Sequence, residues 1–208
     1  RVVRAGHPWL FRDALEAFDL PPGAAVRVLD RKGRFLASGL AEAGPIGVRV
    51  FSLRDEPPSA ALFAERIASA LALRARLVPP ATDAYRLIHG EGDRLPGVVC
   101  DRYGEHAVLK LDGEAALAHR DALARALQRE LSPLGIRSLL VRASRKQEQA
   151  PALAWGEPPP PELRVQEHGM WLIANLYEGQ KTGLFLDHRE TRARVRRLAA
   201  GQSALNLY

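Results

Sequence analysis

The residues whose types and spacing best suit chemistry form a short polar turn between two glycines. Gly179 and Gly183 bracket Gln180, Lys181 and Thr182, which supply a cation and two uncharged hydrogen-bonding side chains. Because glycine lets the backbone bend and come close to a ligand, the pattern predicts a turn that faces a ligand. Lys181 and Thr182 are the first candidates for contact.

The segment that follows this turn predicts a basic helix. Asp187 stands at the expected N-cap with Glu190 three residues later, as in a capping box, and the helix is expected over residues 187–200. Three of its arginines share one face by their spacing: Arg189, Arg192 and Arg196. That face fits contact with RNA phosphates and fits an ordinary solvated surface equally well.

An aromatic and basic cluster near the N-terminus suggests nucleic-acid contact. Trp9 and Phe11 stand close to Arg4 and Arg12, a combination that can meet bases and phosphates. Alternatively both rings fill the end of a small barrel, which we favour because aromatic residues in small domains are more often core. Together with a later polar loop, the candidate RNA contacts are Arg4, His7, Trp9, Arg12, Arg145 and Lys146. For that loop, simple solvation is the favoured interpretation.

A loop over residues 90–97 carries two carboxylates, Glu91 and Asp93. The pair invites a metal or acid–base interpretation, but without a histidine or a third ligand it is a weak signal. We favour a structural turn in which Asp93 or Glu91 holds backbone N–H groups.

Short strands and two helices must position these residues. The alternating patterns predict strands over 25–29, 35–40, 48–53, 85–88, 98–101, 106–111 and 136–141, and a hairpin of 163–167 with 170–175. Ser59 caps a predicted helix that runs to about Val78, and leucines from Leu117 to Leu131 predict a second helix. The first three strands are short and consecutive, which favours a compact barrel.

Composition bounds the function classes. With 208 residues, 47% of them hydrophobic, the chain is long enough for one or two domains. A net charge of +6 suits a polyanionic partner such as RNA without establishing one. The single cysteine, Cys100, excludes an intrachain disulfide or a multi-cysteine zinc site, and no apolar run approaches the roughly 20 residues of a membrane span. We therefore expect a cytoplasmic protein without a membrane partner.

Five motifs, taken in order, resemble the RlmI-type ribosomal RNA methyltransferases. They are His7–Phe11, Tyr85–Gly97, Asp101–Gly104, Glu167–Gly169 and Gly179–Arg189. The match extends over essentially the whole chain, and the last motif is the most specific. His188 is a departure, because the family often has glutamine there.

The resemblance implies a mixed α+β fold in three parts. Residues 1–56 would form a PUA-like RNA-binding β-barrel, and residues 57–162 a linking helix with a central α+β domain. Residues 163–208 would form the first elements of a Rossmann-like α/β methyltransferase domain, which would be incomplete.

The implied reaction is methyl transfer from S-adenosyl-L-methionine (SAM) to the 5-position of a cytosine in 23S ribosomal RNA. Such chemistry needs a thiolate that adds to the base beside that position, and the base must leave its stack. Cys100 lies in an apolar strand and is expected to pack in the core. The resemblance therefore implies that the catalytic cysteine and a glycine-rich cofactor loop lie beyond Tyr208, and that this fragment is inactive alone.

The resemblance also implies a set of cofactor-side residues and leaves alternatives open. The set is Gln180, Lys181, Thr182, Asp187, Arg189 and Asn206. For Asp187 and Arg189, a capped helix start with an ion pair is an equal alternative. Ribosomal RNA is the implied partner, and a homodimer is left open. The competing functions are a non-catalytic PUA-type RNA-binding protein and an RNA methyltransferase with another target nucleotide.

Overall fold

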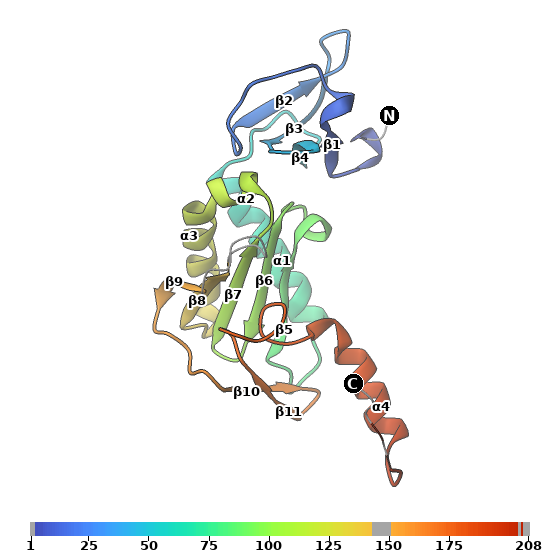
Figure 1. Ribbon diagram of the computed structural model, residues 1–208, viewed down its shortest axis with the longest axis vertical. Helices are drawn as coiled ribbons and strands as arrows, with labels where there is room; N and C mark the ends of the chain where they lie inside the picture. Colours follow the sequence, from blue (N-terminus) through green and yellow to red (C-terminus); the bar gives the residue numbers. More distant parts are fainter. Residues whose placement is uncertain (1–2, 143–150, 204, 206–208) are drawn as a thin grey trace.

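The chain is described by a computed structural model that covers residues 3–142, 151–203 and 205. Three layers follow one another along the long axis: an N-terminal sheet, a central sheet with helices, and a hairpin with a projecting helix (Figure 1). The mixed fold class expected from the sequence is confirmed.

The N-terminal sheet has four antiparallel strands, β1 (Trp9–Phe11), β2 (Ala25–Leu29), β3 (Phe35–Ala41) and β4 (Ile46–Ser52). Its order is β1-β4-β3-β2, and short 3-10 turns η1 (Val3–Ala5) and η2 (Arg12–Ala14) flank β1. The three expected strands are confirmed. Among the described residues β1 and β2 form the two edges, so the hydrogen-bond ladder is open, whereas the sequence favours a compact barrel.

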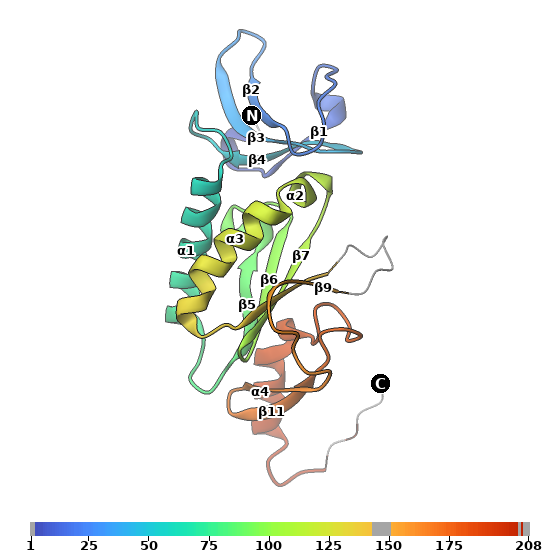
Figure 2. The same cartoon turned by 90° about the vertical axis from the view of Figure 1, so that its left-hand side faces the viewer.

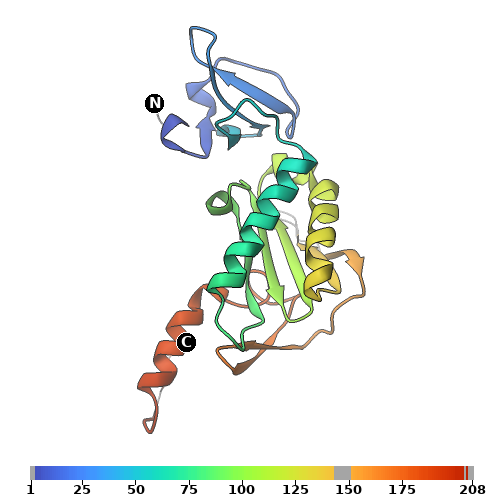
Figure 3. The same cartoon turned by 180° about the vertical axis from the view of Figure 1, so that it is seen from behind.

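Helix α1 (Ala60–Leu77) runs from the N-terminal sheet down one face of the central sheet (Figure 3). The Ser59 hydroxyl accepts the Leu62 N–H at 3.3 Å, so the expected N-cap is confirmed. Its apolar face buries Phe63 and Ile67.

The central sheet has five strands in the order β5-β6-β7-β8-β9. They are β5 (Ala84–His89), β6 (Val98–Tyr103), β7 (His106–Leu111), β8 (Ser138–Arg142) and β9 (Ala152–Gly156), with the 3-10 turn η3 (Gly90–Asp93) after β5. Strands β7 and β8 are parallel, and α2 (Glu114–Ala118), α3 (Arg120–Leu131) and η4 (Ser132–Leu134) connect them. The expected second helix is thus split at His119, and β9 had not been expected.

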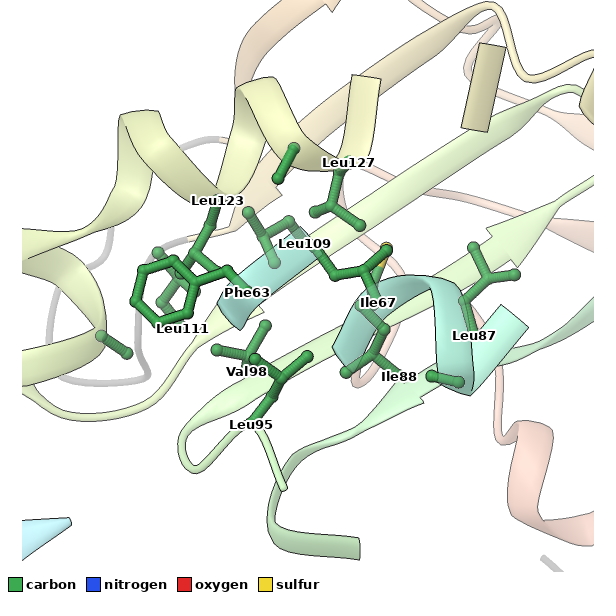
Figure 4. Close-up of a cluster of buried hydrophobic side chains, with 14 of the residues drawn as sticks. Phe63, Ile67, Leu87, Ile88, Leu95, Val98, Leu109, Leu111, Leu123 and Leu127 are labelled. Atoms are coloured by element: carbon green, nitrogen blue, oxygen red, sulfur yellow. The ribbon is translucent and has the colours of Figure 1, made fainter. Parts of the chain in front are cut away.

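The main core lies between this sheet and the two long helices. Helices α1 and α3 lie side by side on one face of the sheet (Figure 2). Phe63 and Ile67 of α1 meet Leu123 and Leu127 of α3 over Leu109 of β7 (Figure 4). A smaller core on the opposite face joins the sheet to the hairpin through Tyr103, Val165 and Leu176, among others.

The hairpin pairs β10 (Leu163–Glu167) with β11 (Met170–Ala174), as expected. Its turn places His168 and Gly169 at φ 49° and 73°, the left-handed region that glycine adopts readily. A 3-10 turn, η5 (Leu186–His188), then leads into α4 (Arg189–Leu198). No helix in the described part of the chain has both the length and the apolarity of a membrane span.

Candidate functional site

The glycine-bracketed turn is held against the central sheet by its backbone. Arg142, at the end of β8, donates Nη1 to the carbonyls of Gly179 and Lys181 at 2.8 and 2.6 Å, and Nη2 to the Tyr177 carbonyl at 3.3 Å. One guanidinium thus holds three carbonyl groups within residues 177–181. The predicted turn exists, and it is anchored by its carbonyl groups.

Thr182 points into the protein rather than toward a ligand. It is 2% exposed, its hydroxyl donates to Asp101 at 2.6 Å, and it shares a 2.8 Å hydrogen bond with the Tyr103 hydroxyl. A ligand could not reach it without breaking these bonds. The expectation that Thr182 lines a pocket is therefore corrected: Thr182 fastens the turn to β6.

The groups around Thr182 form a buried polar network. Asp101 is fully buried and also accepts two hydrogen bonds from Arg86, at 2.8 and 3.2 Å. Burial, followed by the charge of Asp101, raises the pKa of Tyr103 far above its usual value, so its hydroxyl stays protonated. The Tyr103 oxygen accepts the Leu184 N–H at 3.2 Å. The network has every partner it needs and serves to position the loop.

Lys181 and Asp187 form an exposed ion pair. The Lys181 Nζ lies 2.7 and 2.9 Å from the Asp187 carboxylate oxygens and 4.4 Å from the Phe185 ring centroid. The hydrogen bond from Lys181 lowers the pKa of Asp187. Helix α4 begins at Arg189 and has no side-chain cap, so the prediction that Asp187 is its N-cap is wrong. The Asp187 carboxylate forms the ion pair with Lys181 instead. Gln180 is exposed.

A cavity of about 400 Å³ opens next to this ion pair. Asp187 and Arg189 line it from η5 and α4, and Tyr85, Arg86 and His89 line it from β5. Arg189 donates to Glu190 at 3.0 Å. The structure therefore brings two of the predicted cofactor-side residues together around one space and leaves Gln180, Lys181 and Thr182 outside its lining.

The lining groups suit binding rather than bond making. They offer guanidinium and imidazole donors and two carboxylates, those of Asp187 and Glu190, with no thiol among them. Cys100 is fully buried, and burial raises the pKa of its thiol, which confirms it as core. Among the described residues no group of three or more His, Cys, Asp or Glu side chains could hold a metal ion.

The arginines of α4 dock the helix onto the hairpin. Arg192 makes two 2.7 Å hydrogen bonds to Glu167, a carboxylate that is 1% exposed. Arg196 donates to the His168 carbonyl at 3.1 Å. Neither phosphate tracking nor a purely solvated face describes these two side chains.

The aromatic cluster lies at the boundary between the N-terminal sheet and the central domain. The Trp9 indole donates to Glu91 at 3.0 Å. Phe11 is 45% exposed, so the expectation that both rings fill a core is wrong for Phe11, because β1 is an edge strand. His7 bonds the Trp9 backbone.

The basic residues that are candidates for RNA contact differ in how many bonds they make within the protein. Arg4 is exposed on η1. Arg12 donates to the carbonyls of Gly44 and Glu42 at 3.1 and 2.6 Å and stacks on Phe18, so it helps hold β1 in place. Arg145, Lys146 and Asn206 lie outside the described residues.

The carboxylates of the 90–97 loop have structural roles, which confirms the interpretation that the sequence favours. Asp93 accepts the His89 N–H at 2.6 Å and a bidentate pair from Arg74 at 2.6 and 2.7 Å. Glu91 accepts from Trp9 and, at 3.3 Å, from Arg49.

Sequence reasoning missed a buried charge pair beside this loop. Arg49 and Glu42 are each 4% exposed, and Arg49 Nε lies 2.6 Å from a Glu42 oxygen. Glu42 also accepts the N–H groups of Glu114 and Ala115, which ties the N-terminal sheet to α2. The available signal was a charge at each of two positions within otherwise apolar, strand-like stretches.

Comparison with known proteins agrees with this architecture. A family model described as a PUA-like domain matches residues 1–53. A ribosomal RNA large subunit methyltransferase I from Erwinia tasmaniensis is 37% identical over 97% of this chain and 53% of its own length. The chain spans about half the length of the curated relatives it matches.

Solved structures share the fold. A candidate SAM-dependent methyltransferase from Streptococcus mutans matches 93% of this chain and 50% of its own, with a TM-score of 0.80 and 19% identity. A candidate methyltransferase crystallised with SAH matches the same shares with a TM-score of 0.83 and 19% identity. At this identity the likeness concerns the fold alone. The resemblance seen in the motifs is thus confirmed: residues 1–53 match a PUA-like domain model, and 97% of the chain is similar to about half the length of proteins named ribosomal RNA large subunit methyltransferase I.

Proposed function

We propose that the chain is the RNA-recognition and scaffold portion of a SAM-dependent ribosomal RNA methyltransferase. The observation that carries this proposal is the 37% identity, over nearly the whole chain, to proteins named for that activity. In this proposal residues 1–56 recognise RNA, residues 57–162 act as linker and central domain, and residues 163–208 begin the methyltransferase domain. The protein would work in the cytoplasm, where ribosomal RNA is.

The cavity beside Asp187 would form one border of the methyl-donor site. SAM carries an amino-acid carboxylate and a positive sulfonium, and the lining offers Arg189 and Arg86 together with the carboxylate of Asp187. Lys181 would hold Asp187 in place through their ion pair. SAM would supply the methyl group, while these side chains would bind and orient the donor.

Methylation at the cytosine 5-position, which we propose for the complete protein, needs a thiolate that Cys100 does not supply. Cys100 is the single cysteine of the 208 residues, and burial raises the pKa of its thiol, which keeps it protonated. The nucleophile would therefore come from residues outside this chain. We accordingly expect the 208-residue chain to bind RNA without transferring a methyl group.

A methyl-transfer assay with the complete gene product and 23S ribosomal RNA tests the activity. We expect label from methyl-tritiated SAM to enter the RNA and to be recovered as 5-methylcytidine after digestion. Label in another nucleoside would support a methyltransferase with a different target. No transfer, with RNA binding retained, would favour a non-catalytic RNA-binding protein and contradict the enzymatic proposal.

A further inference from the structure

A second cavity, of about 380 Å³, lies where the N-terminal sheet meets the central domain. Its walls come from β4 and the segment after it, from α1, and from the η3 loop. Three arginines line it, Arg54, Arg66 and Arg94, against a single carboxylate, Glu91. Its lining shares no residue with the cavity beside Asp187.

Arg66 carries an unsatisfied charge into this cavity. It is 6% exposed, and its Nε and Nη1 atoms are buried without a hydrogen-bond partner among the described residues. Burial, followed by the nearby charge of Arg94, lowers the pKa of Arg66. Burying an unpaired cation is among the most unfavourable arrangements in a protein. A bound anion would compensate the buried charge of Arg66.

The remaining lining groups leave Arg66 unsatisfied. Glu91 already accepts hydrogen bonds from Trp9 at 3.0 Å and Arg49 at 3.3 Å. Arg54 is exposed and lies 3.5 Å from Glu56. The backbone of Arg94 has φ 57°, in the left-handed region that is unfavourable for residues other than glycine. No ion pair of Arg94 occurs within the described ranges.

We propose that this cavity binds a phosphate of the RNA backbone, with Arg66 as the buried anchor and Arg54 and Arg94 at its rim. Guanidinium groups match phosphate oxygens in geometry and charge, and three of them surround one space here. The inference rests on the proposed function, since the RNA substrate supplies the phosphate. Such a contact would fix the register of the RNA across the junction without reading its sequence.

Two variants and a matched control test the site. Arg66→Met removes the buried guanidinium and keeps an apolar stem, so the protein should fold at least as well as wild type. Arg94→Gly removes a rim guanidinium and suits the positive φ. Arg76→Met removes an exposed arginine further along the same helix, α1, outside the cavity lining.

The first measurement follows the midpoint temperature of thermal unfolding of the wild type and the variants. It is made in inorganic phosphate, acetate or chloride at equal ionic strength. Phosphate should raise the midpoint of wild type and Arg76→Met more than chloride does, and this difference should vanish in Arg66→Met and shrink in Arg94→Gly. Equal phosphate effects in wild type and Arg66→Met would overturn the site. Equal stabilisation by acetate would point to a protein carboxylate as the ligand and would also overturn it.

The second measurement uses a ribosomal RNA fragment. Arg66→Met should weaken binding about tenfold and reduce the slope of log K against log salt by about 1, while Arg76→Met behaves as wild type. Unchanged RNA binding by Arg66→Met would refute the proposal. If wild type bound no RNA, the proposed function would fail, and the phosphate measurement would still decide whether the cavity is an anion site.

Discussion

At the scale of single residues, a hydroxyl that the sequence places in a ligand-facing turn proves to be an internal fastener. Thr182→Val keeps the shape of the side chain but removes the hydrogen bonds to Asp101 and Tyr103. Because both partners are buried, we expect a loss of about 1–3 kcal/mol in the free energy of unfolding, measured by urea denaturation.

The exposed Thr191 provides the matched control. Thr191→Val on α4 should change the free energy of unfolding by no more than about 0.5 kcal/mol. If the two variants unfolded at the same urea concentration, Thr182 would not hold the turn against β6.

His106 predicts a pH dependence of stability. Its side chain bonds Ser138 at 2.8 Å, and burial lowers its pKa from 6.5. Below pH 6.5 the unfolded chain therefore binds more protons than the folded one, so stability falls as the pH drops from 6.5 toward the lowered pKa.

Replacing His106 should remove that part of the slope. His106→Gln is expected to flatten the fall in thermal midpoint below pH 6.5, while the exposed His188→Gln keeps it. Identical slopes in His106→Gln and wild type would contradict this assignment.

The sequence predicted which residues lie in the polar turn, but it did not predict the groups to which their side chains bond. Lys181 and Thr182 are neighbours in the sequence, yet one faces solvent and the other is buried. The difference comes from Asp101, 81 positions away from Thr182, a contact that local spacing does not encode. Arg66 was missed because the helical spacing places it beside the apolar stripe of α1, where an arginine is expected to reach solvent, whereas its side chain is buried.

At the scale of elements, the ion pair between Arg192 and the buried Glu167 helps to hold α4 against the hairpin. Arg192→Met would leave the Glu167 carboxylate buried without its cation, which costs about 3–5 kcal/mol in comparable cases. We expect α4 to separate from the hairpin, which faster amide hydrogen exchange over residues 189–198 would report.

Arg194→Met is the control for this prediction. Arg194 is exposed on the same helix, so its replacement should leave exchange in α4 unchanged. Equal protection of α4 in both variants would show that Arg192 does not hold the helix.

Most strands and α1 could be predicted because alternation, helical spacing and a serine cap are local signals. The start of α4 could not, because Asp187 had a capping pattern but a stronger partner in Lys181. Strand β9 was missed because its pairing with β8, rather than its own short sequence, defines it.

At the scale of the whole molecule, the buried pair of Arg49 and Glu42 lies at the N-terminal sheet and bonds to the central domain. Arg49 reaches Glu91 and Asp112. Glu42 accepts the N–H groups of Glu114 and Ala115. Arg49→Met would leave Glu42 buried and unpaired and remove the links to Glu91 and Asp112. We expect a loss of about 3–5 kcal/mol and faster proteolysis in residues 53–59. Adding Glu42→Gln should restore part of the stability; no recovery would argue against the pair as the link.

The order of the layers could be inferred from the family resemblance, but the junction between them could not. The charged residues of its cavity come from three segments far apart in the sequence: the one after β4, helix α1 and the η3 loop. The cavity that Arg66 lines exists because those segments meet.

The central claim is that this chain recognises ribosomal RNA through phosphate contacts. Its most direct test is the affinity of the wild-type chain for a ribosomal RNA fragment over a series of salt concentrations. We expect binding at low salt and a log K that falls linearly and steeply with log salt. Affinity that does not change with salt, or no binding at low salt, would contradict it.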